Sequence, residues 1–122
     1  MNNPLPANAV VWAEIPVTDM EKSKAFYTAV VGNELKDNVN GPNPMADFQS
    51  SGGVAGHIYP GKPAANGAGN TVHLAVSGTV EQAMERVTEA GGTVLSPVIE
   101  IPAGRFAYCL DPDGNSIGIF VS

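Results

Sequence analysis

The sequence repeats its own pattern at an offset of 61 residues, which is half of its 122-residue length. Residues 10–26 (VVWAEIPVTDMEKSKAF) align without a gap with residues 71–87 (TVHLAVSGTVEQAMERV). In both segments an apolar run leads into a threonine, and a Glu or Gln follows three positions later. This spacing is typical of a capping box, in which the threonine begins a helix. The pattern predicts helices that begin at Thr18 and Thr79, each directly after a strand.

The rest of each half follows the same plan. The segment after each threonine has the apolar spacing of an amphipathic helix, and Gly32 and Gly91 favour the left-handed conformation that ends one. Residues 47–60 align with residues 108–121, and each segment carries a turn-forming stretch, SSGG or DPDG, between two candidate strands. With a short strand expected at NEL or TVL after the helix, each half should read strand, helix and three strands.

The two halves together predict one domain of the α+β class. The repeats cover about residues 8–60 and 70–122, and a linker rich in Gly, Pro and Ala joins them at 61–69. Because one half cannot cover its own sheet, two halves are expected to build a curved mixed sheet with helices outside and a concave face inside. The irregular segment 37–46 is a candidate flap over that face.

Composition removes several classes of protein from consideration. Six Lys and Arg residues against twelve Asp and Glu give a net charge of −6, whereas nucleic-acid binding requires clustered basic residues. The sequence shows neither a signal-peptide leader nor the roughly 20 apolar residues that span a membrane. A single cysteine, Cys109, excludes an internal disulfide and is expected in the core. We expect a cytoplasmic protein with no nucleic-acid or membrane partner.

The alternation of strand residues separates a helix-packed face from an inside face. In the first strand Ile15 and Val17 belong to the packed set, and in the last strand Ile117 and Ile119 do. The offset of 61 matches inside residues in pairs, so that Trp12 falls on His73 and His57 on Gly118. The inside set, expected to line a cavity, is Trp12, Glu14, His57, Tyr59, His73, Gly118 and Phe120.

The duplication, together with IPVTDMEKSKAFY (15–27) and DPDGNSIGIF (111–120), resembles the vicinal oxygen chelate superfamily. This superfamily includes glyoxalase I, extradiol dioxygenases, fosfomycin resistance enzymes and bleomycin resistance proteins. The resemblance covers nearly the whole chain and looks nearest to small uncharacterised glyoxalase-like proteins. It implies the glyoxalase/bleomycin resistance fold and a homodimer, since family members pair their curved sheets, sometimes by exchanging halves.

The resemblance also implies where a metal would lie. In glyoxalase-type members four His, Gln or Glu side chains on equivalent inner strands hold one divalent ion, and these places correspond to Trp12, His57, His73 and Gly118. An indole nitrogen only donates and glycine has no side chain, so two histidines remain, and a catalytic metal needs at least three ligands. No metal is therefore the preferred expectation, and the alternative is Fe, Zn, Ni or Mn held by His57, His73 and Glu14.

Glu14 has two interpretations that the sequence leaves open. A carboxylate inside a sheet must be hydrogen-bonded or paired, so Glu14 is either a catalytic or ligand-anchoring group or a structural partner of a histidine, Trp12 or Arg105. Arg105 itself is either a clamp for an anionic group or a surface arginine, and the facing of Tyr108 is undetermined. The candidate ligand-binding residues, whose aromatic members suit a flat or apolar ligand, are Trp12, Glu14, Phe48, His57, Tyr59, His73, Arg105 and Phe120.

Two functions therefore remain open, and with them whether the protein is an enzyme. The first is a metal-depleted cavity that binds a small organic molecule in a sequestration or resistance-type role, as in the acidic, metal-free bleomycin resistance proteins. The second is a metal-dependent lyase, isomerase or dioxygenase of the same superfamily that uses His57, His73 and Glu14. The fold alone does not decide between them, because it hosts both.

Overall fold

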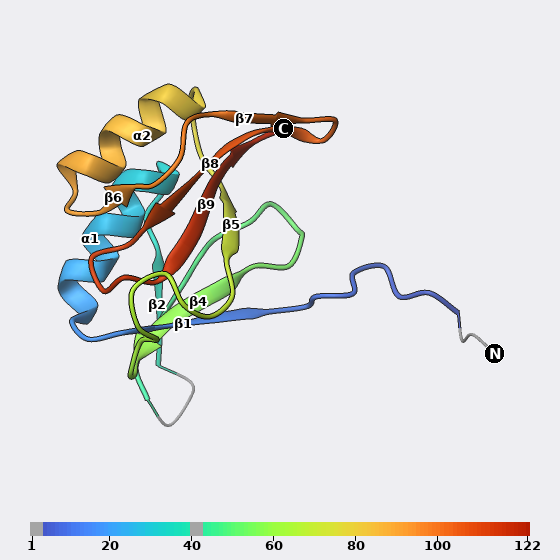
Figure 1. Cartoon of the computed structure of the whole chain (residues 1–122). Helices are drawn as coiled ribbons and strands as arrows, with labels where there is room; N and C mark the ends of the chain where they lie inside the picture. The colour runs from blue at the N-terminus through green and yellow to red at the C-terminus, as the bar shows by residue number, and fades with distance from the viewer. Residues whose placement is uncertain (1–3, 40–42) are drawn as a thin grey trace.

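The computed structural model describes residues 4–39 and 43–122 of the chain. Within these residues two βαβββ units follow one another, and the second has one additional strand, which confirms the predicted α+β class and tandem plan. In chain order the elements are β1 (Ala13–Val17), α1 (Met20–Val31), β2 (Lys36–Asn38), β3 (Met45–Asp47), β4 (Gly56–Pro60), β5 (Val72–Ala75), α2 (Val80–Glu89), β6 (Thr93–Val94), β7 (Ile99–Ile101), β8 (Gly104–Leu110) and β9 (Ser116–Val121). Figure 1 shows α1 and α2 together on one side of the strands.

The strands form two mixed sheets with the same plan. The first has the order β1-β4-β3-β2 and the second β5-β9-β8-β6, with β7 paired to the other end of β8. β1 is parallel to β4 in the first sheet, and β5 is parallel to β9 in the second. All other neighbouring strands are antiparallel. Among the described residues β1 and β5 do not pair with each other, so the expected concave surface is built from two separate sheets with a free edge on each.

The number of residues that separates equivalent positions of the two halves is not constant along the chain. One predicted pair of equivalent residues is therefore corrected. In the parallel pairs Glu14 lies opposite His57, and His73 lies opposite Gly118. Because His57 and Gly118 are equivalent, Glu14 is the counterpart of His73, and the predicted match of Trp12 with His73 is wrong. The two halves are thus 59 residues apart in their first strands and 61 in their last, so a gapless alignment places β1 two residues out of register.

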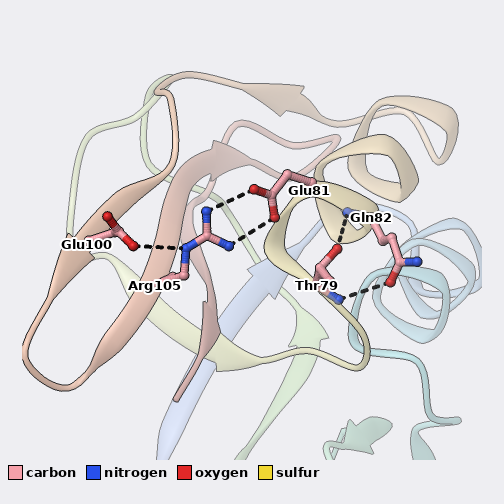
Figure 2. A network of polar contacts seen from close by, with 5 residues as sticks. All are labelled: Thr79, Glu81, Gln82, Glu100 and Arg105. Carbon is pink, nitrogen blue, oxygen red and sulfur yellow. Dashed lines mark hydrogen bonds and ion pairs between the residues drawn. The ribbon is translucent and has the colours of Figure 1, made fainter.

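One of the two predicted helix starts is confirmed and the other is wrong. At α2 the hydroxyl of Thr79 accepts from the backbone N–H of Gln82 at 3.1 Å, and Gln82 Oε1 accepts from the N–H of Thr79 at 3.0 Å (Figure 2). At α1 the cap is Asp19, whose carboxylate accepts from a backbone N–H three residues on at 3.1 Å. Thr18 lies one residue before this cap, and its hydroxyl donates to Asp113 at 2.5 Å.

The strands after the helices differ partly from the sequence prediction. β6 lies within the predicted TVL stretch, whereas β2 begins after NEL (33–35), at Lys36. The candidate flap 37–46 contains part of β2 and part of β3, which pair with each other, so its described ends belong to the first sheet. Residues 40–42 of that segment lie outside the described residues.

The core lies between the two helices and the sheets. As predicted from alternation, Ile15, Val17, Ile117 and Ile119 are buried, and full burial of one such side chain contributes about 1.5–3 kcal/mol. Cys109 is also fully buried, and burial raises the pKa of its thiol to about 11. The expectation that this cysteine is a core residue is therefore confirmed.

A turn at residues 111–115 in the second half is hydrogen-bonded to the first half. The hydroxyl of Tyr27 on α1 donates to Asp111 Oδ2 at 2.6 Å, and the amide of Asn115 donates to the carbonyl of Pro16 at 2.8 Å. Asp111 is 3% exposed, and its other carboxylate oxygen accepts two backbone N–H bonds within the turn. This turn therefore fixes the position of one sheet relative to the other.

An N-terminal arm, residues 4–12, precedes β1 and extends away from both sheets except at its end, where Trp12 bonds to His57 (Figure 1). All nine of its residues are exposed, including the apolar Leu5, Val10 and Val11. Val11 continues the alternation of Ile15 and Val17 along the chain, but it precedes β1 and is exposed. In the part of the chain that is described, neither helix has the length and apolar character needed to cross a membrane.

Candidate functional site

A cavity of about 1070 Å³ lies between the two halves. Both free edge strands line it, with Trp12 and Glu14 contributed by the β1 side and His73 by β5. The remaining lining combines apolar residues such as Ile15 and Leu74 with polar ones such as Gln49. The cavity therefore lies at the gap between the two edge strands, and residues from both faces of β1 and β5 line it.

Trp12, His57 and Glu14 form a hydrogen-bonded triad on the first sheet. The indole Nε1–H of Trp12 donates to Nδ1 of His57 at 2.9 Å, and Nε2 of His57 lies 3.0 Å from Glu14 Oε2. An indole N–H has no acceptor capacity, so Nδ1 must accept and the proton of the neutral imidazole lies on Nε2. His57 therefore donates to Glu14, and both of its ring nitrogens are occupied.

His57 and Glu14 differ in how far their side chains are exposed to solvent. The side chain of His57 is only 8% exposed, whereas that of Glu14 is 64% exposed and lines the cavity. Within the described part of the chain, the second carboxylate oxygen of Glu14, Oε1, has no hydrogen-bond partner. Of the predicted structural partners of Glu14, the histidine is confirmed and Arg105 is wrong. The arrangement leaves one carboxylate oxygen available to a molecule in the cavity.

An aromatic cluster lies on the inside face of the second sheet. The ring of His73 lies over Gly118, where any Cβ would clash with it, and packs edge-on against Phe106 with centroids 5.0 Å apart. Tyr108 and Phe120 complete the cluster, with centroids 5.8 and 6.0 Å from that of His73. These contacts settle the facing of Tyr108, which lies on the inside face.

Three other predicted site residues occupy different surroundings. Phe48 lines the cavity and also packs edge-on against Tyr27, with centroids 5.4 Å apart. Tyr59 lies edge-on to His57, with centroids 5.9 Å apart, and is outside the cavity lining. Phe120 likewise belongs to the aromatic cluster and is not part of the lining.

Arg105 is not in the cavity, and the prediction that it clamps an anionic ligand there is wrong. Its guanidinium donates two bonds to the carboxylate of Glu81 on α2, at 3.1 and 2.9 Å, and lies 3.5 Å from Glu100 (Figure 2). These bonds lower the pKa of Glu81 and raise the pKa of Arg105. The alternative interpretation, a surface arginine, is correct because β8 carries this side chain toward α2.

Sequence reasoning missed three residues at or near the site. Glu34 lines the cavity as a second carboxylate, and Phe106 is central to the aromatic cluster. Asp47 lies opposite His57 on β3, and its buried Oδ1 has no hydrogen-bond partner in the described structure. Asp47 could have been found from its position on the strand expected to pair with that of His57. Phe106 could have been found because it lies two residues from Tyr108 and so shares its face of the strand.

The residues present do not fit the divalent metal of glyoxalase-type proteins. Across residues 4–39 and 43–122, no three His, Cys, Asp or Glu side chains are grouped closely enough to hold a metal ion. The corrected register does put Glu14, His57 and His73 at three of the four equivalent positions. Trp12 and Glu14 nevertheless occupy both nitrogens of His57, and Gly118 supplies no ligand.

The fold agrees with comparisons to known proteins. The chain belongs to the glyoxalase/bleomycin resistance protein/dioxygenase superfamily, whose family model matches residues 9–119. A search of curated proteins gave no match.

Solved structures with the same fold cover nearly all of the chain. A glyoxalase/bleomycin resistance protein from Albidiferax ferrireducens T118 is 26% identical, with a TM-score of 0.70 over 93% of this chain and 98% of that one. A hypothetical protein from S. aureus is 24% identical, with a TM-score of 0.69 over 95% and 98% of the two chains. The fosfomycin resistance protein FosX from Mesorhizobium loti is 16% identical, with a TM-score of 0.66 over 97% and 94%.

Proposed function

We propose that the protein binds a small organic molecule in the cavity between its two halves and does so without a metal ion. The observation that carries this proposal is the Trp12–His57–Glu14 triad. It uses both nitrogens of the histidine that a metal would need and directs the exposed carboxylate of Glu14 to the cavity. A metal-free site of this kind can hold and orient a ligand through hydrogen bonds and apolar contact.

The size and chemistry of the cavity support ligand binding. Small-molecule sites typically enclose roughly 300–1,000 Å³ and combine apolar walls with a few polar groups. The cavity of about 1070 Å³ has this character, with Ile15, Phe48 and Leu74 among its apolar residues. A sequestration or resistance-type role is consistent with relatives that are named bleomycin or fosfomycin resistance proteins.

The second candidate function is that of a metal-dependent lyase, isomerase or dioxygenase. It is favoured by one observation, the placement of Glu14, His57 and His73 at three of the four equivalent strand positions. It requires Trp12 to release Nδ1 of His57 and requires His73 to leave the aromatic cluster. The first function requires neither change, so we favour it.

We also propose that the protein acts as a homodimer. The edges of β1 and β5 are unpaired in the described structure, and unpaired edges are commonly covered by another chain. The exposed apolar side chains of the N-terminal arm provide further surface that association would bury.

Metal analysis and ligand screening together test the proposed function. Untagged protein purified without chelator is expected to contain no stoichiometric Fe, Zn, Ni or Mn, and to melt at a higher temperature with members of a small-molecule library. A ligand present at 100 times its Kd stabilises the folded state by about 2.7 kcal/mol, which such a screen detects readily. Stoichiometric metal together with metal-dependent consumption of a glutathione hemithioacetal or a catechol would establish the second function instead.

A further inference from the structure

We infer that the ligand of this cavity is an organic cation, in which a protonated amine or amidine group is joined to an apolar or aromatic body. The inference rests on the proposed function and narrows it to one class of ligand. It follows from the charges that line the cavity, from the state in which Trp12 holds His57, and from the character of the walls.

The described lining of the cavity carries two acidic side chains, one histidine (His73) and no Lys or Arg. Glu14 and Glu34 both line it, whereas none of the six Lys and Arg residues does, all of which are described. Lys24 and Arg105 are paired with carboxylates elsewhere, and Arg86 donates to backbone carbonyls near the end of α1. A cavity with two carboxylates and no Lys or Arg side chain attracts a positively charged ligand.

The triad keeps the charge of Glu14 uncompensated. An imidazolium beside Glu14 would form an ion pair and cancel its charge, but a charged ring needs a proton on Nδ1. That position faces the indole N–H of Trp12, which can only donate. His57 therefore supports Glu14 as a neutral donor through Nε2, and the free oxygen Oε1 is the acceptor left for an ammonium or amidinium N–H.

The walls beside Glu14 suit the apolar part of such a ligand. Trp12 is 45% exposed and lines the cavity two residues from Glu14 on the same side of the chain. Phe48 and His73 contribute two further rings, and an aromatic face also attracts a cation directly. A carboxylate in a cavity that several rings also line therefore predicts a ligand in which the cationic group is attached to a flat or apolar body.

Three probes with the same phenyl body test the inference. They are 3-phenylpropan-1-amine, 3-phenylpropan-1-ol and 3-phenylpropanoate, which are cationic, neutral and anionic near neutral pH. Trp12 is the only tryptophan of the chain, so its fluorescence in the full-length protein reports binding next to Glu14. The amine is expected to bind about tenfold tighter than the alcohol, because a hydrogen bond between charged groups is stronger than one to a neutral hydroxyl. The carboxylate probe is expected to bind weakest.

Matched variants identify the group responsible. Glu14→Gln keeps the side-chain size and removes the charge, so it should abolish the preference for the amine while leaving the affinity for the alcohol. Glu85→Gln removes a carboxylate on the exposed surface of α2, outside the cavity, and should leave the preference intact. Glu34→Gln is expected to reduce the preference partly. If Glu14→Gln fails to fold, added salt provides the same test on the parent protein, because salt should weaken binding of the amine and not of the alcohol.

The outcomes separate this inference from the proposed function. Equal affinities for amine and alcohol, or a preference for the carboxylate, would overturn the cation inference and leave the binding function in place. Binding of none of the probes would also overturn it, and the binding function would then depend on the library screen. An amine preference that survives Glu14→Gln would show that the recognition assigned here to Glu14 is wrong.

Discussion

The hydroxyl of Tyr27 and the buried carboxylate of Asp111 lie 2.6 Å apart and join α1 of the first half to the turn that ends β8 in the second. The carboxylate also holds its own turn through the backbone N–H groups of residues 113 and 115. This bond therefore joins two parts of the chain that are 84 residues apart in sequence.

Tyr27→Phe is expected to lower the free energy of unfolding by about 1.5–3 kcal/mol, the range for a hydrogen bond to a charged group. Burial and the nearby Asp111 raise the pKa of Tyr27 well above its ordinary value, so the native phenol stays neutral when the unfolded one ionises. Stability should consequently fall as the pH rises above about 10, and the variant should show a smaller fall. Urea unfolding at a series of alkaline pH values measures both effects, and equal slopes for parent and variant would contradict the assignment.

Cys109 contributes a second alkaline dependence. Its pKa is raised from 9.0 to about 11 by burial, so an unfolded thiolate forms before the native thiol ionises. The free energy of unfolding should therefore decline between pH 9 and 11, by roughly 3 kcal/mol at most. Cys109→Ala should remove this part of the pH slope, and the native thiol should react slowly with Ellman's reagent at neutral pH. Fast reaction in the folded protein would show that the thiol is accessible.

Gly118→Ala is expected to displace the ring of His73, because an added Cβ would overlap it. Overpacking of this kind costs about 1–3 kcal/mol, and the contact of His73 with Phe106 should be lost. The matched control is Gly53→Ala, since a Cβ at Gly53 meets nothing within 4 Å. Denaturation and the NMR signals of the His73 ring measure the two variants, and an unchanged His73 environment in Gly118→Ala would refute the packing.

Trp12→Phe is expected to remove one of the two hydrogen bonds that fix the tautomer of His57, while keeping an aromatic side chain at the cavity. In the parent protein the ring nitrogens should show one neutral tautomer with the proton on Nε2, because Trp12 donates to Nδ1. Without the indole N–H, the carboxylate of Glu14 still holds the proton on Nε2, so both tautomers should be populated only when Glu14 is also replaced by Ala. Nitrogen-15 NMR of labelled histidine reports this directly, with His73 as an internal reference. A parent protein already in mixed tautomers would argue against the triad.

Association is expected at micromolar concentration and should depend on the N-terminal arm. Val10 and Val11 are 74% and 64% exposed there, so Val10→Asp together with Val11→Asp should weaken a dimer that buries them. Val39→Asp is the control, because Val39 is also exposed but lies outside the arm. Light scattering after gel filtration gives the mass of each variant. A monomeric parent protein would refute the homodimer, and equal effects of all substitutions would remove the arm from it.

Local patterns made the architecture predictable from sequence, whereas long-range hydrogen bonds made the site unpredictable. Thr79 caps its helix as the capping-box spacing requires, but Thr18 has the same spacing and bonds to Asp113, 95 residues away. Alternation placed Glu14 and His73 on inside faces correctly. Alternation could not show that Trp12 would donate a hydrogen bond to His57, 45 residues away, and so occupy Nδ1 of that histidine.

The register error has a similar physical origin. Gapless alignment assumes connections of equal length, yet two residues separate β1 from α1 and four separate β5 from α2. The shift moves the counterpart of His73 from Trp12 to Glu14. Sequence periodicity therefore identified which residues lie on the inside face of each sheet. Only the strand pairing identified which residues of the two sheets are structurally equivalent.

The turn at residues 111–115 also bears on how proteins of this plan diversify. Because Tyr27 and Asp111 join the two halves outside the cavity lining, substitutions around the ligand need not break this bond. Stability and selectivity are thus assigned to separate groups of side chains. Proteins of this plan can therefore change the ligand that they bind while the bond between the two halves is kept.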